Sequence, residues 1–150
     1  MSSVSVRAII IKDNSILLLR RNRPGIHPYY VTPGGRVEKN EKLNDALKRE
    51  CLEELGVRVK VGKHLAIFIA QYPDGKREQQ YFRCTIIGGK IGTGTGPEYQ
   101  PGGGYSGTYT PVWVPKNKVA ALPFRPKKVL QMLMRQFSGV SSFRENSTRF

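Results

Sequence analysis

The sequence predicts one α/β domain, and three observations point to it. The chain has 150 residues, a length that suits a single domain with a buried core. Short runs rich in β-branched residues, bounded by turn residues, predict strands at the start and in the middle of the chain. Residues 43–55 have helical spacing instead, and a second helical pattern comes later. We expect the domain to span residues 1–137, followed by a flexible polar tail at residues 138–150.

The first elements are predicted to be strands. Residues 4–11 and 16–20 are rich in β-branched residues or leucine, and they flank Asp13-Asn14, a pair that favours a tight turn. They therefore predict a β-hairpin. Residues 20–28 are basic and contain prolines, so a loop is expected there, and residues 29–32 predict a short strand after it.

The middle of the chain combines one helix with further strands. Apolar residues recur at helical spacing over residues 43–55, and Gly56 suits the position just past a helix end. Three strands are expected next, at residues 57–61, 64–72 and 77–87. Pro73-Asp74-Gly75 is typical of a turn between the last two.

The last part of the chain begins with a glycine-rich segment. Residues 88–107 hold nine of the sixteen glycines, which predicts a long mobile loop of the kind that serves as a lid. A strand is expected at residues 109–114 and a short helical turn at residues 116–121. Residues 126–137 predict the final helix, whose regularly spaced apolar residues should join the core.

Composition and charge narrow the class of protein. The net charge of +14 indicates a surface that attracts polyanions such as nucleotides, nucleic acid or anionic lipid, although a basic surface also serves solubility alone. No apolar run approaches the roughly 20 residues of a membrane-spanning helix, so we expect a cytoplasmic protein without a membrane partner. Cys51 and Cys84 have no spacing typical of a zinc site or disulfide framework, and both are expected to be buried apolar residues.

Acidic residues are concentrated in one segment of this basic chain. Six of the eleven acids fall within seventeen residues: Glu38, Glu41, Asp45, Glu50, Glu53 and Glu54. On a helix the last three lie within an arc of about 100°. The opposite side is apolar and is expected to be buried; it carries Leu47, Cys51, Leu52 and Leu55.

Crowded carboxylates repel one another on a helix, and a divalent cation removes that cost. Carboxylate oxygens with no thiolate or imidazole beside them suit Mg²⁺ or Mn²⁺, and Mg²⁺ commonly binds through carboxylates together with substrate phosphates. From the residues alone, an acidic face paired with Lys48 and Arg49 is a nearly equal alternative.

The segment from Gly35 to Val57 resembles the Nudix box, GX5EX7REUXEEXGU, in which U is a bulky aliphatic residue. Every fixed position is filled, by Gly35, Glu41, Arg49, Glu50, Glu53, Glu54 and Gly56. Cys51 at the first aliphatic position is a soft departure. The preceding residues also resemble the strand, basic loop and Pro-Gly-Gly entry of this family.

The resemblance implies a Nudix-type α/β/α sandwich with a central mixed β-sheet. It also implies a hydrolase acting on phosphoanhydride bonds, with a nucleoside diphosphate linked to another moiety as substrate and Mg²⁺ or Mn²⁺ as cofactor. The residues implied as metal ligands are Glu50, Glu53, Glu54 and, through its backbone carbonyl, Gly35. Arg49 would orient a glutamate, whereas Glu41 and Gly56 would be structural.

Two roles are left to residues in and outside the box. The general base is expected to be Glu53 or Glu54, with Glu98 in the glycine-rich loop as a further candidate. Arg20, Arg21 and Arg23 lie just before the Pro-Gly-Gly turn and are candidates for binding substrate phosphates.

Two alternative functions stay open on the sequence. The positive charge also suits a pyrophosphohydrolase acting on RNA 5′ ends, and a non-catalytic nucleotide- or nucleic-acid-binding Nudix module is the third reading. The sequence does not set the oligomeric state and allows a dimer.

Overall fold

The computed structural model describes residues 2–96 and 107–137. The strands are β1 (Ser3–Ile9), β2 (Ile11–Lys12), β3 (Ser15–Arg23), β4 (Ile26–Val31), β5 (Gly34–Arg36), β6 (Val57–Tyr72), β7 (Gly75–Gly89) and β8 (Thr108–Pro115). The helices are α1 (Leu43–Leu55), α2 (Lys116–Val119), the 3₁₀ turn η2 (Lys127–Val129) and α3 (Leu130–Arg135). Half of the predicted glycine-rich loop, residues 97–106, and the predicted tail lie outside the described residues, and the first two residues predicted for that loop, Gly88 and Gly89, instead end β7.

The strands form two four-stranded sheets. The first has the order β5-β1-β7-β6 and is mixed, because β1 and β7 run parallel whereas the other pairs are antiparallel. In the second, β3 pairs with β2 and β4 on the path β2-β3-β4 and also with β8, all antiparallel. The predicted first hairpin is thus divided between sheets, since β1 joins the first sheet and only β2 pairs with β3. Its turn is as predicted, with positive φ at both Asp13 and Asn14.

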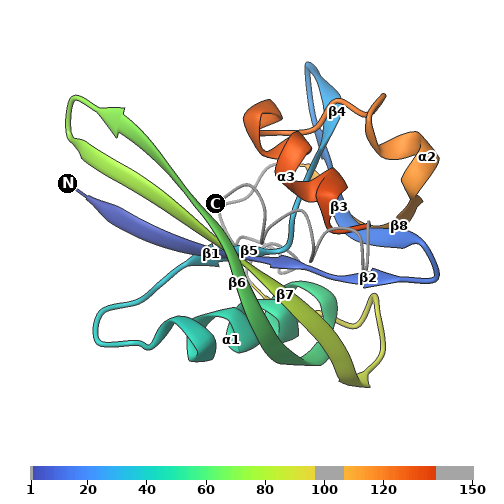
Figure 1. Cartoon of the computed structure of the whole chain (residues 1–150), viewed down its shortest axis with the longest axis horizontal. Helices are drawn as coiled ribbons and strands as arrows, with labels where there is room; N and C mark the ends of the chain where they lie inside the picture. The colour runs from blue at the N-terminus through green and yellow to red at the C-terminus, as the bar shows by residue number, and fades with distance from the viewer. Residues whose placement is uncertain (1, 97–106, 138–150) are drawn as a thin grey trace, which may run out of the picture.

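The helices cover the strands from two sides. Figure 1 shows α1 on one side of β1, β6 and β7, with α2 and α3 on the other. The core has two clusters accordingly, one containing the buried residues of α1 and one containing those of α2 and α3. Strand β3 contributes to both: Leu17 and Leu19 join the α1 cluster, and Ile16 and Leu18 join the other, as alternation along a strand requires. The predicted α/β class and mixed sheet are confirmed.

Helix α1 has the predicted bounds. It ends where Gly56 takes the left-handed conformation, with φ 80°, and donates its N–H to the Leu52 carbonyl at 3.0 Å. The expected burial of Leu52 is wrong, because its exposed fraction is 51% while Glu54 is buried. The buried stripe runs through Leu47, Cys51 and Leu55 and includes Glu54; Leu52 lies a further 100° round from Cys51 and so faces solvent.

Two predicted boundaries are also wrong. The expected loop at residues 20–28 is a β-hairpin, in which β3 continues to Arg23 and Gly25, with φ 75°, allows a tight turn into β4. Pairing of β3 with β8 along residues 15–22 explains why the charged end stays extended. The strands expected at residues 57–61 and 64–72 are one strand, β6, whose register shifts between Val61 and Ala66.

Both cysteines are buried, as predicted. The final helix, predicted at residues 126–137, begins with the 3₁₀ turn η2 and continues as α3. Among the helices of the described residues, none is long and apolar enough to cross a lipid bilayer.

Candidate active site beside the first helix

A pocket of about 750 Å³ lies beside α1. It is the "first pocket" below. Three acids of the helix line it, Glu50, Glu53 and Glu54, next to the β5 backbone at Gly34 and Gly35. The cationic residues that line it are Arg7, Arg21, Arg36, Lys39 and Arg49. Carboxylates and cations therefore share one hollow in which a polyanion and a metal ion can both be bound.

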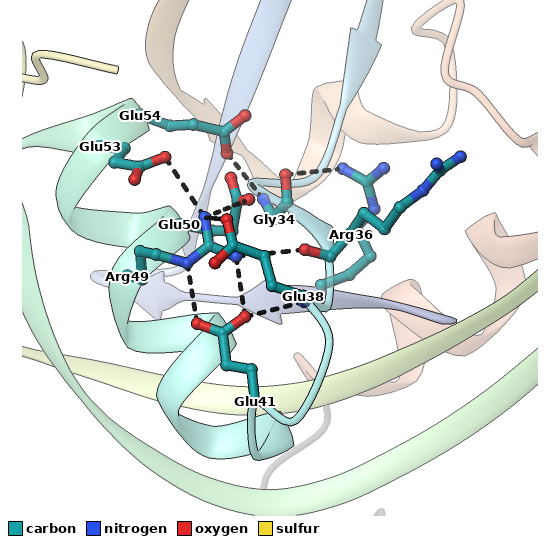
Figure 2. Close-up of polar contacts among 9 residues, drawn as sticks. Gly34, Arg36, Glu38, Glu41, Arg49, Glu50, Glu53 and Glu54 are labelled. Atoms are coloured by element: carbon teal, nitrogen blue, oxygen red, sulfur yellow. Dashed lines mark hydrogen bonds and ion pairs between the residues drawn. The ribbon is translucent and has the colours of Figure 1, made fainter. Parts of the chain in front are cut away.

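Arg49 joins the acidic side chains in this pocket (Figure 2). Its Nε and Nη2 donate to the two carboxylate oxygens of Glu41 at 2.8 and 3.0 Å. Its Nη1 donates to Glu50 at 3.0 Å and lies 3.4 Å from the Glu53 carboxylate, while Nη2 also reaches the Arg36 carbonyl at 3.2 Å. The hydrogen bond from Arg49 lowers the pKa of Glu41 below its usual range. Arg49 is thus held by Glu41 on one side and contacts Glu50 and Glu53 on the other.

Glu50 sits directly against the backbone of β5. Its side chain is only 13% exposed, and this burial raises the pKa of its carboxyl, while the positive charge of Arg49 acts in the opposite direction. A Cβ on Gly35 would lie 2.5 Å from a Glu50 carboxylate oxygen. Any side chain larger than hydrogen at residue 35 would therefore displace this carboxylate.

Glu54 is fixed by the backbone at the start of β5. Its carboxylate is buried and accepts the Gly34 N–H at 2.7 Å. Figure 2 shows this bond between Glu54 and Gly34. The Gly34 carbonyl also accepts a hydrogen bond from Arg7 at 3.4 Å. Helix α1 and strand β5 are therefore held together at the point where the glutamates enter the pocket.

The three glutamates provide a donor set that suits Mg²⁺ or Mn²⁺, because all are hard carboxylate ligands on one helix face lining one pocket. Within residues 2–96 and 107–137, no three acidic, histidine or cysteine side chains are arranged as a ready-made metal site. Glu50 and Glu53 point to Arg49, and Glu54 points to the Gly34 N–H. Binding of an ion would thus require rotation of at least the two carboxylates beside Arg49.

The family model of the NUDIX domain matches residues 1–133 of the chain. The chain belongs to the Nudix family. The expected resemblance is confirmed, and the site just described occupies the Nudix box, residues 35–57.

Curated relatives match only part of the chain. An ADP-ribose pyrophosphatase of Methanocaldococcus jannaschii is 35% identical over 94 residues, which are 61% of this chain and 56% of the relative. A putative 8-oxo-dGTP diphosphatase of Bacillus subtilis is 32% identical over 82 residues, 55% of this chain and 52% of the relative. The chain thus spans about half the length of these relatives.

The fold is shared along nearly the whole chain. A Nudix hydrolase from Nitrosomonas europaea superposes with a TM-score of 0.71 at 18% identity, covering 97% of this chain and 90% of that structure. At an identity this low, the superposition shows a shared fold and nothing further.

Of the three arginines predicted to bind phosphate, only Arg21 lines the first pocket. Arg21 is buried, lines the first pocket and lies 3.9 Å from the centre of the Tyr109 ring. Arg20 and Arg23 are not among the lining residues. Alternation along β3 accounts for Arg20, because it shares a face with Leu18, whereas Arg21 shares the face of Leu19.

Sequence reasoning missed five residues that line the first pocket: Arg7, Tyr29, Arg36, Lys39 and Tyr109. Arg7 carried a signal, since it is a lone charge within the apolar run at residues 4–11. Arg36 and Lys39 lie one and four residues after Gly35, in the variable positions of the box. The two tyrosines reach the pocket through strand pairing, for which the sequence carries no local signal. Glu98, the further candidate base, lies outside the described residues.

Glu41→Gln is expected to lower the free energy of unfolding by about 1 kcal/mol, because it weakens a two-pronged, partly exposed ion pair with Arg49. Urea denaturation measures this. The difference from wild type should be present at pH values above the ordinary glutamate pKa and vanish as the pH falls through the lowered pKa of Glu41. Glu38→Gln is the control, since Glu38 is 68% exposed and 3.9 Å from Arg49. Equal effects of the two substitutions would contradict the anchoring role.

Proposed function

We propose that this Nudix chain hydrolyses the pyrophosphate linkage of a nucleoside diphosphate joined to another moiety, with Mg²⁺ or Mn²⁺ as cofactor. The observation that carries the proposal is the first pocket, where Glu50, Glu53 and Glu54 share one hollow with Arg7 and Arg21. Carboxylates can hold a metal ion while arginines bind phosphate oxygens, and phosphoryl transfer depends on these two contributions. The names of the relatives, a pyrophosphatase and a putative diphosphatase, support the same reaction.

The three glutamates share one part in the proposal, and Glu53 has a second. Glu50, Glu53 and Glu54 would hold the metal, and Gly35 would add its carbonyl. The ion supplies charge neutralisation on the phosphates and acidifies a coordinated water. Glu53 would accept the proton of the attacking water, because it is the most exposed of the three, at 34%, and its contact with Arg49, at 3.4 Å, is longer than the 3.0 Å contact of Glu50.

The other side chains would orient the substrate. Arg21 would donate to oxygens of one phosphate through its planar fork. Arg49 would hold Glu50 and Glu53 in place, as its hydrogen bonds do in the structure. As the oxygen of the water bonds to one phosphorus, the bridging P–O bond breaks and the electron pair leaves with the second phosphate.

A panel of nucleotides tests the proposal. The full chain would be incubated with Mg²⁺ or Mn²⁺ and nucleoside triphosphates, nucleotide sugars, ADP-ribose and dinucleoside polyphosphates, and the products separated to show which bond breaks. We expect a nucleoside monophosphate as one product from at least one class. Absence of hydrolysis across the whole panel would favour a non-catalytic nucleotide-binding module instead.

RNA with a 5′ triphosphate is the second candidate substrate. Residues 108–137 contain six lysines and arginines and no acid, and α2 and α3 lie within this range. A basic surface of this kind binds the phosphates of a polynucleotide at many points, so affinity falls steeply with salt. Raising NaCl from 50 to about 200 mM should therefore lower kcat/KM far more for RNA than for a mononucleotide if RNA is the substrate.

A further inference from the structure

A second pocket of about 500 Å³ adjoins the first. The two share Arg7 and Val31 in their linings. Arg7 marks the junction, because its guanidinium donates to the Thr32 carbonyl at 3.0 Å and approaches the Gly34 carbonyl at 3.4 Å. A substrate whose pyrophosphate lies beside Glu50 in the first pocket can therefore extend past Arg7 into the second.

The second pocket is strongly cationic. Arg7, Arg77, Arg125 and Lys128 line it, and among the described residues no acid does. Arg77 is paired with Asp74 at 3.3 Å, and Arg7 is bound to Gln79 and backbone carbonyls. Arg125 and Lys128 form no ion pair with any acid in residues 2–96 and 107–137. Their charges are the ones left for a ligand to neutralise.

Two aromatic rings of this pocket, Tyr72 and Phe68, and the nearby Tyr29 of the first pocket have a cation over one face, whereas the third ring of the lining, Tyr81, is buried and packs edge-to-face on Phe68. Arg125 lies 3.9 Å from the centre of the Tyr29 ring, Arg77 lies 4.1 Å from that of Tyr72, and the Lys128 ammonium lies 5.9 Å from that of Phe68. A neutral base needs a free ring face on which to stack, whereas these rings hold the cations in place. The pocket thus favours an anion over an uncharged ring.

We propose that the second pocket binds a further phosphate monoester of the substrate, through Arg125 and Lys128. The preferred substrates are then nucleoside diphosphate derivatives that carry an additional phosphate away from the linkage that is cleaved. This inference rests on the proposed function, because it assigns the selectivity of the same reaction. The inference gives Arg125 and Lys128 a role in binding this phosphate and gives none to their neighbour Lys127, which does not line the pocket.

The test uses two pairs of compounds that share a diphosphate linkage and differ by one phosphate: coenzyme A with dephospho-coenzyme A, and NADP⁺ with NAD⁺. We expect kcat/KM to be at least about tenfold higher for the phosphorylated member, equivalent to about 1.4 kcal/mol, with most of the difference in KM. The ratio should fall as salt is raised, because both cations are exposed. If neither member of a pair is hydrolysed, their inhibition constants against a hydrolysed panel substrate give the same ratio.

Variants locate the effect. Arg125→Ala and Lys128→Ala should each lower the ratio severalfold, and the double variant should bring it near one, chiefly by raising KM for the phosphorylated member. Lys127→Ala is the matched control and should keep the wild-type ratio. Thermal denaturation checks folding, and Lys128→Ala serves alone if Arg125→Ala is unstable, since Arg125 packs on Tyr29.

The outcomes separate the two proposals. A wild-type ratio near one, or a ratio that the variants leave unchanged, overturns the second-pocket assignment while the hydrolase remains. Failure to hydrolyse these compounds and every nucleotide of the panel overturns the proposed function, and the assignment with it.

Discussion

Replacing Glu53 or Glu54 with glutamine is expected to lower kcat by about 10³-fold with little change in stability. Glutamine keeps the size of the side chain and an oxygen that can accept the Gly34 N–H, which Glu54 binds at 2.7 Å. It removes the negative charge that the proposal assigns to metal binding and, for Glu53, to proton transfer. The loss should therefore fall on the transition state and leave the packing of α1 intact.

Steady-state kinetics on the best substrate of the panel, together with thermal denaturation, measure both effects. Glu38→Gln is the control, because Glu38 lines the same pocket but is 68% exposed and lies outside α1. It should keep kcat within about threefold of wild type. Near-normal turnover in both Glu53→Gln and Glu54→Gln would contradict the roles proposed for these glutamates in metal binding and proton transfer.

Much of the site could be predicted because its pieces are local in sequence. The box residues lie on one helix and the loop before it, so their spacing fixes which side chains share a face. The bounds of α1 were predictable for the same reason, since helical periodicity and Gly56 are both read along the chain. The predicted Mg²⁺ or Mn²⁺ site itself stays a prediction.

What could not be predicted depends on which strands pair. The sequence of residues 4–11 reads as one strand, yet β1 and β2 belong to different sheets, and this division brings Arg7 to the junction of the two pockets. Arg125 meets Tyr29 only through contacts between β4 and the segment before α3, where Tyr30 accepts the Arg125 N–H. Residues this far apart in the chain leave no local pattern in the sequence when they come into contact, so the second pocket was not predicted.

Gly34→Ala is expected to lower the free energy of unfolding by about 3 to 5 kcal/mol, close to the whole stability of many domains. Gly34 has φ 145°, and a Cβ there would lie 1.9 Å from the Val6 carbonyl oxygen and 2.9 Å from the Arg7 Cα. These are backbone atoms of the paired strand β1, so relief requires β5 to separate from it. Such a shift would also move the N–H that Glu54 binds, and activity should fall with stability.

Gly25→Ala separates backbone strain from steric overlap. Gly25 also has a positive φ, 75°, but nothing lies within 4 Å of a Cβ at that position. Its substitution should cost only about 1 kcal/mol, the usual penalty for a left-handed alanine. Urea denaturation of both variants gives the comparison. Similar losses in the two would mean that β5 can move away from β1 at little cost, and the position of Glu54 would then not depend on the close approach of Gly34 to Val6.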